Sequence, residues 1–206
     1  MTQLLVATLN AGKFAEVEAY LRPFAVETLF LKNLESYPAV LEDGATFEAN
    51  AIKKAQTLAV FSGRLTLADD SGLEVDALGG APGIYSARYA GDACDDQRNN
   101  EKLLRELREV PEAQRTARFV CTLALCEPEG REPRIWTVQA SCEGRITFAL
   151  KGVHGFGYDP LFFYPPFGKT FGEIDRETKA TVSHRGKALQ KLAELLRGGV
   201  ALRAKP

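Results

Sequence analysis

The sequence is poor in side chains that bind transition metals and has no long apolar run. It contains two histidines, and its four cysteines include no C-x-x-C pair, so a structural zinc site is not expected. Cys121 and Cys126 lie in apolar stretches, which indicates small core residues of a reduced protein. No apolar run reaches the roughly 18 residues of a membrane-spanning helix, and no secretory signal follows Met1. We therefore expect a soluble, cytoplasmic protein with no membrane partner.

An excess of positive charge is also missing. The chain carries 26 Lys and Arg against 27 Asp and Glu, a formal net charge of −1. Nonspecific binding to nucleic acid depends on many Lys and Arg contacts to phosphates. We therefore expect no nucleic-acid partner, although a small anion can still be bound locally. The motif G-x-S-x-G is absent too, which disfavours a serine hydrolase that would use Ser71 with His184.

Strand-like and helix-like segments are interleaved along the 206 residues. That length fits one domain, and the interleaving predicts an α/β fold with a mixed central sheet flanked by helices. The expected strands are residues 4–10, 65–69, 116–127, 134–146 and 161–164. Strands 116–127 and 134–146 are expected to form a hairpin across a polar turn at 128–133. The expected helices are residues 12–22, 46–63 with Thr46 as N-cap, 95–110, and a last helix capped by Ser183, after which residues 198–206 should fray.

Two segments of the first half carry polar groups suited to phosphate and metal. In TLNAGK (8–13) a strand opens into a helix whose first N–H groups, together with Lys13, can attract an anion; a surface lysine after a βα turn is the alternative. In LADDSGL (67–73) the adjacent acids Asp69 and Asp70 stand at the expected end of a strand. One of them could hold a hard cation such as Mg²⁺ or accept a proton from water. The alternative is a turn whose backbone both side chains bind.

Two segments of the second half carry groups suited to a nucleobase. In GFGYDP (155–160), Phe156 is flanked by glycines and could stack on a base, unless Phe156 and Tyr158 are core aromatics. In KATVSHRGKAL (179–189), cations gather at an expected helix start, where they are unhelpful unless an anion or a carbonyl group lies there. A solvated basic face is the alternative. Together the four segments fit a nucleoside triphosphate with Mg²⁺.

The same segments resemble motifs of the inosine triphosphate pyrophosphatase family. The matching stretches are ATLNAGKFAEVEAYL, ADDSGLEVDALGGAPGIYSARYAG, GFGYDPLFF and SHRGKAL, in this order and nearly from end to end of the chain. The resemblance implies the fold of that family, with residues 1–206 as one nucleotide-pyrophosphatase domain of two lobes around an active-site cleft. It also implies Mg²⁺-dependent hydrolysis of ITP, dITP or XTP to the nucleoside monophosphate and pyrophosphate. This reaction removes noncanonical purine nucleotides from the nucleotide pool. The resemblance further implies a homodimer.

The resemblance also implies roles for individual residues. Asp70 would be the general base and a metal ligand with Glu42, Lys13 would assist catalysis, and Asp69 would be a supporting acid. The residues implied to bind substrate are Thr8, Asn10, Lys13, Lys54, Ser71, Phe156, Gly157, Tyr158, Asp159, Lys179, His184 and Arg185.

One position departs from the family pattern, because Leu9 stands where the family usually has glycine. If this position needed a positive φ, leucine would be strained there; we expect a strand-end conformation that accepts leucine. Two other functions stay open. A Maf-type nucleotide pyrophosphatase would act on pyrimidine or modified nucleotides, and a non-catalytic nucleotide-binding module would have no need for Asp70.

Overall fold

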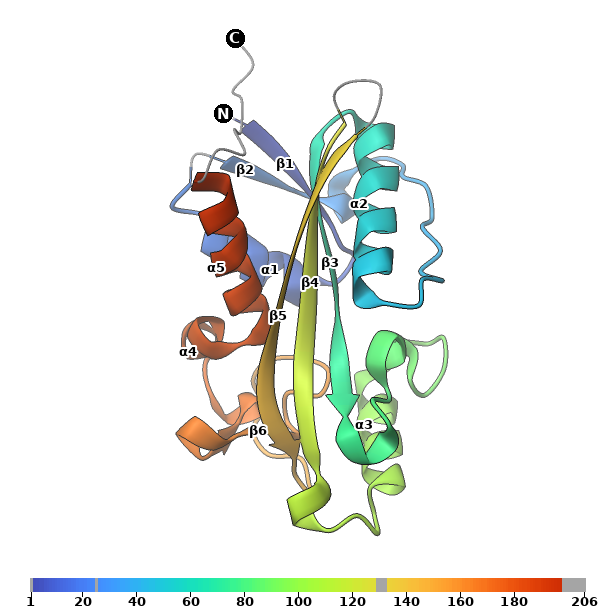
Figure 1. Ribbon diagram of the computed structural model, residues 1–206, viewed down its shortest axis with the longest axis vertical. Helices are drawn as coiled ribbons and strands as arrows, with labels where there is room; N and C mark the ends of the chain where they lie inside the picture. The colour runs from blue at the N-terminus through green and yellow to red at the C-terminus, as the bar shows by residue number, and fades with distance from the viewer. Residues whose placement is uncertain (1, 25, 129–132, 198–206) are drawn as a thin grey trace. The chain divides into compact units, whose positions relative to one another are not determined.

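The computed structural model describes residues 2–24, 26–128 and 133–197, and its strands form a seven-stranded mixed sheet (Figure 1). The strand order is β2-β1-β3-β4-β5-β6-β7, with β1 parallel to both neighbours and β6 antiparallel to β5 and β7. The strands are β1 (Thr2–Ala7), β2 (Val26–Phe30), β3 (Leu65–Val75), β4 (Thr116–Glu127), β5 (Arg134–Ile146), β6 (Phe162–Tyr164) and β7 (Lys169–Thr170). The α-helices are α1 (Ala11–Leu21), α2 (Phe47–Ser62), α3 (Asp96–Glu106), α4 (Arg176–Val182) and α5 (His184–Arg197). The expected α/β fold is confirmed.

The chain divides into two compact units, neither of which is a single stretch. Residues 1–70, 121–140 and 185–206 belong to unit 1, and residues 71–120 and 141–184 belong to unit 2. Strands β3, β4 and β5 each begin in one unit and end in the other. Each unit therefore has residues from several parts of the sequence.

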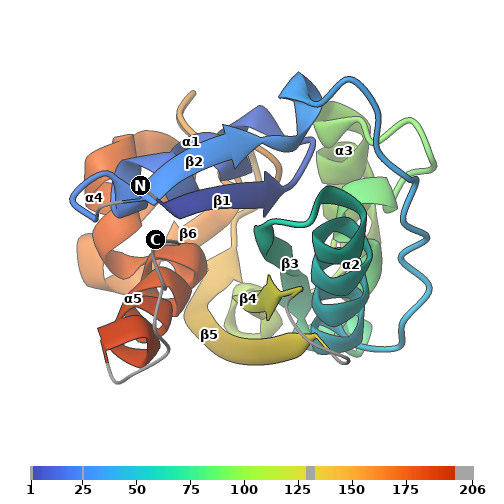
Figure 2. The same cartoon turned by 90° about the horizontal axis from the view of Figure 1, so that it is seen from above.

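Unit 1 has a buried apolar layer on each face of its strands. Helices α1 and α5 lie on one face and α2 on the other (Figure 1, Figure 2). Val17 of α1 and Leu189 of α5 share a core with Val6 and Leu67, while Ala55 of α2 belongs to the opposite core. Alternate strand residues point to opposite faces, which is why both faces of β1 are apolar. The predicted burial of Cys121 and Cys126 is confirmed.

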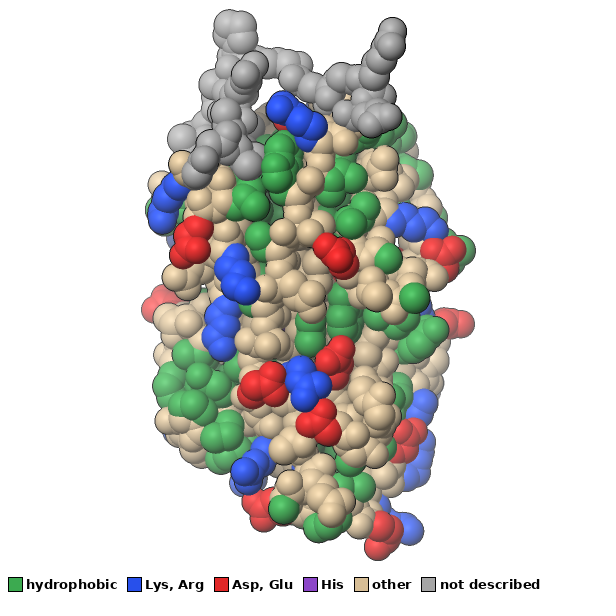
Figure 3. All heavy atoms as spheres, viewed as in Figure 1, with side chains coloured by type: hydrophobic (Ala, Val, Ile, Leu, Met, Phe, Trp, Pro, Cys, Tyr) green, Lys and Arg blue, Asp and Glu red, His purple; other side chains and the backbone are tan. Residues whose placement is uncertain are grey.

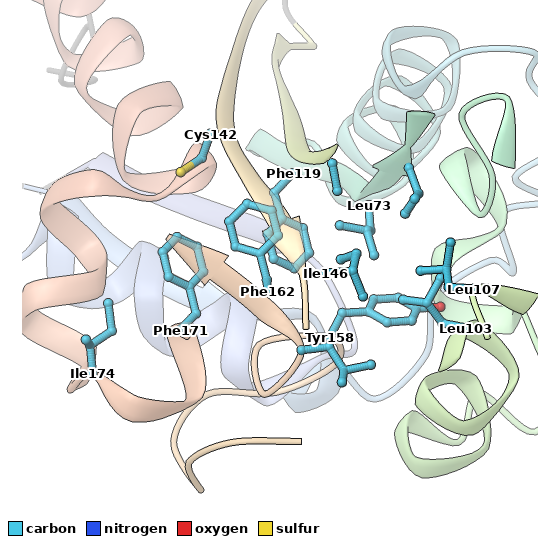
Figure 4. Packing of buried hydrophobic residues seen from close by; sticks show 13 residues of the cluster. Leu73, Leu103, Leu107, Phe119, Cys142, Ile146, Tyr158, Phe162, Phe171 and Ile174 are labelled. Carbon is cyan, nitrogen blue, oxygen red and sulfur yellow. The ribbon is translucent and has the colours of Figure 1, made fainter. Parts of the chain in front are cut away.

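Unit 2 has one aromatic-rich core. Phe119, Phe162 and Phe171 lie close together, with ring centroids 4.5 to 6.1 Å apart (Figure 4). On the other face of the strands, Arg118 pairs with three acids from β3, β5 and the residue after β3. Figure 3 shows acidic and basic side chains interspersed on the viewed face, without a large area of one sign.

Local signals in the sequence located most helix ends correctly. The Thr46 hydroxyl accepts a hydrogen bond from Ala49 N at 3.1 Å, as an N-cap does, and Gly63 ends α2 in the left-handed conformation with φ 63°. Asn10 caps α1 in the same way by accepting from Lys13 N at 3.0 Å. None of the described helices is both long and apolar enough to cross a membrane.

The structure corrects the expected end of the second strand. β3 does not stop at Asp69 but continues to Val75, so Asp69, Asp70 and Ser71 lie inside a strand and form no turn. The alternative in which both acids bind a turn backbone is therefore wrong. Two strands and one α-helix were missed, namely β2, β7 and α4. Ser183 lies between α4 and α5 with extended backbone, as the C-cap of α4. The turn at 129–132 and the tail at 198–206 lie outside the described residues.

Candidate active site

The first predicted segment forms the turn between β1 and α1 in unit 1. The Thr8 hydroxyl accepts a hydrogen bond from Asn10 N at 3.1 Å, and the Asn10 side chain accepts from Lys13 N at 3.0 Å. These contacts shape the start of α1, where the first N–H groups of a helix have no partner within the helix. Among the described residues Cys94 is the one non-glycine residue with a positive φ, so Leu9 adopts an ordinary backbone conformation. The absence of a positive φ at Leu9 is confirmed, but β1 ends at Ala7 and Leu9 lies in a bend after it.

Asp69 is buried beside two cations. Its side chain is 2% exposed and lies 2.6 Å from Lys13 Nζ and 2.7 Å from Arg185 Nε. Cys121 Sγ adds a donor at 3.3 Å from Oδ2. Burial alone would raise the pKa of Asp69, but the charges of Arg185 and Lys13 outweigh it and hold the pKa well below its usual value. Asp69 therefore stays ionised and fixes the positions of both cations.

Arg185 is held from a second side by a residue that the sequence did not single out. Glu16 Oε2 lies 2.5 Å from Arg185 Nη1, and the Arg185 side chain is 2% exposed. Glu16 is on α1, three residues after Lys13, so both side chains project from neighbouring turns of the helix. That i, i+3 spacing is the signal that could have indicated Glu16. The guanidinium group of Arg185 is therefore held by two carboxylates, those of Asp69 and Glu16.

Asp70 faces the opposite side of β3 and has different neighbours. Asp70 Oδ1 lies 3.8 Å from Lys54 Nζ, while Glu42 Oε2 lies 2.9 Å from the same nitrogen. The carboxyl group of Glu42 also acts on the pKa of Asp70. Burial raises the pKa of Asp70 to about 7, opposed by Lys54 and Lys13 and assisted by Glu42. The pKa of Glu42 is lowered, because Lys54 outweighs the effect of burial.

The Asp70 and Glu42 pair fits a magnesium ion. Asp70 Oδ2 is buried and has no hydrogen-bond partner in the described part of the chain, and such an atom is ready to accept a cation or a proton. No cluster of three or more His, Cys, Asp or Glu side chains that could hold a metal occurs among the described residues. Mg²⁺ needs no such cage, since it is usually held by one or two carboxylates together with water and phosphate oxygens.

The loop that carries Glu42 is attached to the first turn of α2. Gly44 N donates to Asn50 Oδ1 at 2.8 Å, and a Cβ at Gly44 would lie 2.7 Å from that oxygen. Lys54 is one helical turn after Asn50 and also donates to Asp69 O at 3.2 Å. Helix α2 thus positions both Glu42 and Lys54 against β3.

The segment 155–160 forms a tight turn in unit 2. Asp159 Oδ2 accepts from Phe156 N at 2.8 Å and lies 2.6 Å from Lys179 Nζ. Gly155 has φ 78°, and a Cβ there would lie 2.0 Å from Asp159 Oδ2, which explains the glycine. Lys179 Nζ is 4.8 Å from the centroid of the Phe156 ring. The Phe156 ring is partly exposed, whereas Asp159 and Lys179 are buried.

Tyr158 and His184 are core residues of unit 2. The Tyr158 hydroxyl donates to Ser86 O at 2.8 Å, and its side chain packs against Leu103 and Leu107 (Figure 4). Burial raises the pKa of Tyr158 above its usual value. The His184 ring stacks on Phe119 at 4.7 Å and is 4% exposed. The ring of Tyr158 is therefore part of the apolar core, as the alternative for this residue predicted.

The predicted site residues fall into two groups, one in each unit. The unit 1 group is Thr8, Asn10, Lys13, Glu42, Lys54, Asp70 and Arg185. The unit 2 group is Ser71, Phe156, Gly157, Tyr158, Asp159, Lys179 and His184. The groups are joined by peptide bonds at two places, Asp70 to Ser71 and His184 to Arg185.

Comparisons with known proteins extend over nearly the whole chain. A model of the Ham1 family matches residues 4–195. The chain belongs to the Ham1 family. A dITP/XTP pyrophosphatase of Desulforamulus reducens is 53% identical over 194 residues, covering 94% of this chain and 95% of the relative. One of Geobacter sulfurreducens is 50% identical over 95% of this chain and 97% of the relative.

Solved structures of the family have the same fold. A HAM1 protein of Coxiella burnetii superposes with a TM-score of 0.85 at 38% identity, over 97% of this chain and all of that one. A nucleoside-triphosphatase or dITP/XTP pyrophosphatase of Mycobacterium abscessus gives a TM-score of 0.74 at 41% identity, over 93% of this chain and 98% of that one. The resemblance to the inosine triphosphate pyrophosphatase family is thereby confirmed.

Proposed function

We propose that the protein hydrolyses the noncanonical purine nucleoside triphosphates dITP, XTP and ITP to the nucleoside monophosphate and pyrophosphate. Relatives about half identical over nearly their whole length are named dITP/XTP pyrophosphatases. The observation that carries the chemistry is the buried Asp70, whose Oδ2 has no partner in the described residues and whose neighbours are Glu42 and Lys54.

The reaction consumes one water and cleaves the linkage between the α- and β-phosphates. A new bond forms between the water oxygen and the α-phosphorus. The bond from the α-phosphorus to the bridging oxygen breaks, and pyrophosphate leaves. Asp70 is the group proposed to take the proton of the attacking water, because its buried Oδ2 has no hydrogen-bond partner in the described part of the chain. Lys54 and Lys13 offset the negative charge of the triphosphate as the water approaches.

We propose Mg²⁺ as the metal and Glu42 with Asp70 as the side chains that hold it. When bound, Mg²⁺ would supply charge neutralisation for the triphosphate. The Thr8 and Asn10 turn and the start of α1 are proposed to bind phosphate oxygens through hydroxyl and N–H donors. Ser71 follows Asp70 directly in β3 and is proposed to contact the substrate.

The unit 2 group is proposed to recognise the base. Phe156 has a partly exposed ring beside Lys179 Nζ, an arrangement suited to stacking on a purine. Hypoxanthine and xanthine carry an oxygen at C6 where adenine carries an amino group. A site lined with donors would leave buried groups unpaired opposite adenine, at about 1–3 kcal/mol each.

The first experiment is hydrolysis of ITP, XTP, dITP, ATP, GTP and dTTP, with pyrophosphate and orthophosphate measured separately. We expect pyrophosphate from ITP, XTP and dITP at rates at least about 100-fold above ATP. Removal of Mg²⁺ with EDTA should stop the reaction, and added Mg²⁺ should restore it. Orthophosphate as the main product would contradict the proposed cleavage.

Other outcomes would favour the alternatives. A preference for dTTP would indicate a Maf-type enzyme, and nucleotide binding without turnover would indicate a binding module. A homodimer is proposed from the resemblance alone, and a cytoplasmic location is proposed as well. Light scattering after size-exclusion chromatography would give the oligomeric state directly.

A further inference from the structure

Helix α3 holds both polar groups of the Gly157 backbone. Asp96 Oδ2 accepts from Gly157 N at 2.7 Å, and Asn100 Nδ2 donates to Gly157 O at 2.9 Å. Asp96 and Asn100 are four residues apart, so they lie on the same side of the helix, one turn from each other. Gly157 has φ 61°, a conformation that glycine adopts without strain.

Gly157 directly follows the aromatic residue proposed to stack on the base. The backbone of Phe156 is bonded on its other side, because Phe156 N donates to Asp159 Oδ2 at 2.8 Å and Phe156 O accepts from Asp159 N at 3.2 Å. With the bond from Asp96 to Gly157 N, both peptide groups beside Phe156 are held by side chains, and the bond from Asn100 to Gly157 O fixes the next peptide group. The ring itself is only partly buried and lies outside the apolar core of unit 2, with Lys179 Nζ 4.8 Å from its centroid, so this backbone contributes to its direction.

Helix α3 is itself anchored to the preceding segment of unit 2. The Asn99 amide accepts from Ala90 N at 2.7 Å and donates to Ala87 O at 2.9 Å. Asp95 caps the helix by accepting from Arg98 N at 3.0 Å. The donor and acceptor that meet Gly157 therefore come from a rigid element.

The side chain of Asn100 is costly for stability. It is 5% exposed, and its Oδ1 has no hydrogen-bond partner in the described part of the chain. A buried polar atom without a partner destabilises a fold, and an apolar side chain of similar size avoids that loss. The amide is therefore better explained by its bond to Gly157 than by stability.

We propose that Asp96 and Asn100 are positioning residues for base recognition. By fixing Gly157 they set the direction in which the Phe156 ring faces a purine, and neither side chain touches the substrate. This inference rests on the proposed function, in which Phe156 stacks on the base. It adds two residues of a helix outside the recognised motifs to the determinants of substrate affinity.

The test uses Asp96, because it is exposed and its replacement leaves the core intact. Asp96→Ala removes the acceptor for Gly157 N and should raise the KM for ITP and the Kd for IMP about three- to tenfold, as expected when one ordered group becomes mobile. The kcat should stay within about twofold of wild type. Asp96→Asn keeps an acceptor oxygen and should restore near-normal KM, although it removes the same charge from the first turn of α3.

Two further measurements separate positioning from a general loss of structure. Inorganic tripolyphosphate has no base, so its inhibition constant should be the same for Asp96→Ala and wild type. Gln97→Ala, on the same turn with an exposed hydrogen bond to Glu101, should leave all constants unchanged. In a double-mutant cycle, Asp96→Ala should have no added effect on IMP affinity once Phe156→Ala is present.

The proposal is overturned if Asp96→Ala binds IMP as wild type does, if tripolyphosphate inhibition weakens to the same extent, or if the two substitutions are additive. These results leave the proposed function intact when wild type hydrolyses ITP to pyrophosphate. A wild-type protein that neither hydrolyses ITP nor binds IMP would instead overturn the proposed function, and the positioning role with it.

Discussion

At the scale of single residues, Asp69 and Asp70 are neighbours in β3 with opposite electrostatic surroundings. Asp69 lies between Lys13 and Arg185, which keep its pKa far below the usual value. Asp70 has one cation at 3.8 Å and a second carboxyl group beside it, and its pKa is raised to about 7. Because successive residues of a strand face opposite sides, two adjacent acids can serve different purposes.

The matched substitutions Asp70→Asn and Asp69→Asn should therefore fail in different ways. Asp70→Asn should keep the fold and the affinity for nucleotide but lower kcat about 10²- to 10⁴-fold, because the proton acceptor is lost. Steady-state kinetics with ITP and equilibrium binding of the same nucleotide would measure this. Unchanged turnover would remove Asp70 from the role of base.

Asp69→Asn should mainly reduce stability. Of the two carboxylates described above, only that of Glu16 would still pair with the buried Arg185. Loss of one partner of a buried ion pair typically costs about 3–5 kcal/mol of stability. Urea denaturation would give the change in the free energy of unfolding. If Asp69→Asn were as stable as wild type while Asp70→Asn was not, the assignment of the two acids would be reversed.

At the scale of elements, the attachment of the 42–44 loop to α2 controls the position of Glu42. A Cβ at Gly44 would lie 2.7 Å from Asn50 Oδ1 and 2.9 Å from Ala49 Cβ. Gly44→Ala should push the loop away from α2 and raise the Mg²⁺ concentration for half-maximal activity about tenfold.

Gly63→Ala at the other end of α2 is the matched control. Gly63 has φ 63°, and no atom lies within 4 Å of the position that a Cβ would take, so alanine there should lower stability by about 1 kcal/mol through backbone strain alone. Its Mg²⁺ dependence should match wild type. Equal Mg²⁺ dependence in the two variants would show that the loop attachment does not position Glu42.

The elements also show which parts of the fold local sequence signals can predict. The ends of α2 were predicted correctly, because Thr46 and Gly63 act on backbone groups within four residues of themselves. β3 was cut short because Asp-Asp-Ser-Gly resembles a turn by composition. The charges that make Asp69 tolerable inside a strand come from Lys13 and Arg185, which are 56 and 116 residues away in sequence.

The same limit applies to the candidate site. The family motifs indicated the residues of both groups, but not the contacts that surround them. Glu16 and Asn50 act through Arg185 and Gly44, contacts that form only on folding. α4 was missed because its seven residues carry little periodic signal, and the buried pair of Lys179 and Asp159 that fixes it joins residues 20 apart.

At the scale of the whole molecule, the apolar cores are divided between the two units while three strands are shared. Two cores lie in unit 1 and one in unit 2. The chain passes from one unit to the other within β3, β4 and β5 and again at the start of α5. A shared strand cannot lose its order in one unit without weakening its pairing in the other, so we expect a single unfolding transition.

The single tryptophan makes this expectation testable, because Trp136 packs against a unit 1 core. Leu161→Ala removes a fully buried side chain of unit 2 and should cost about 2–5 kcal/mol. If the chain unfolds as one cooperative structure, Trp136 fluorescence and far-UV circular dichroism should shift together to the same lower urea midpoint. Leu58→Ala in unit 1 provides the matched control and should shift both signals equally. A Trp136 midpoint that Leu161→Ala leaves unchanged, with a second transition in circular dichroism, would mean that the units unfold independently despite their shared strands.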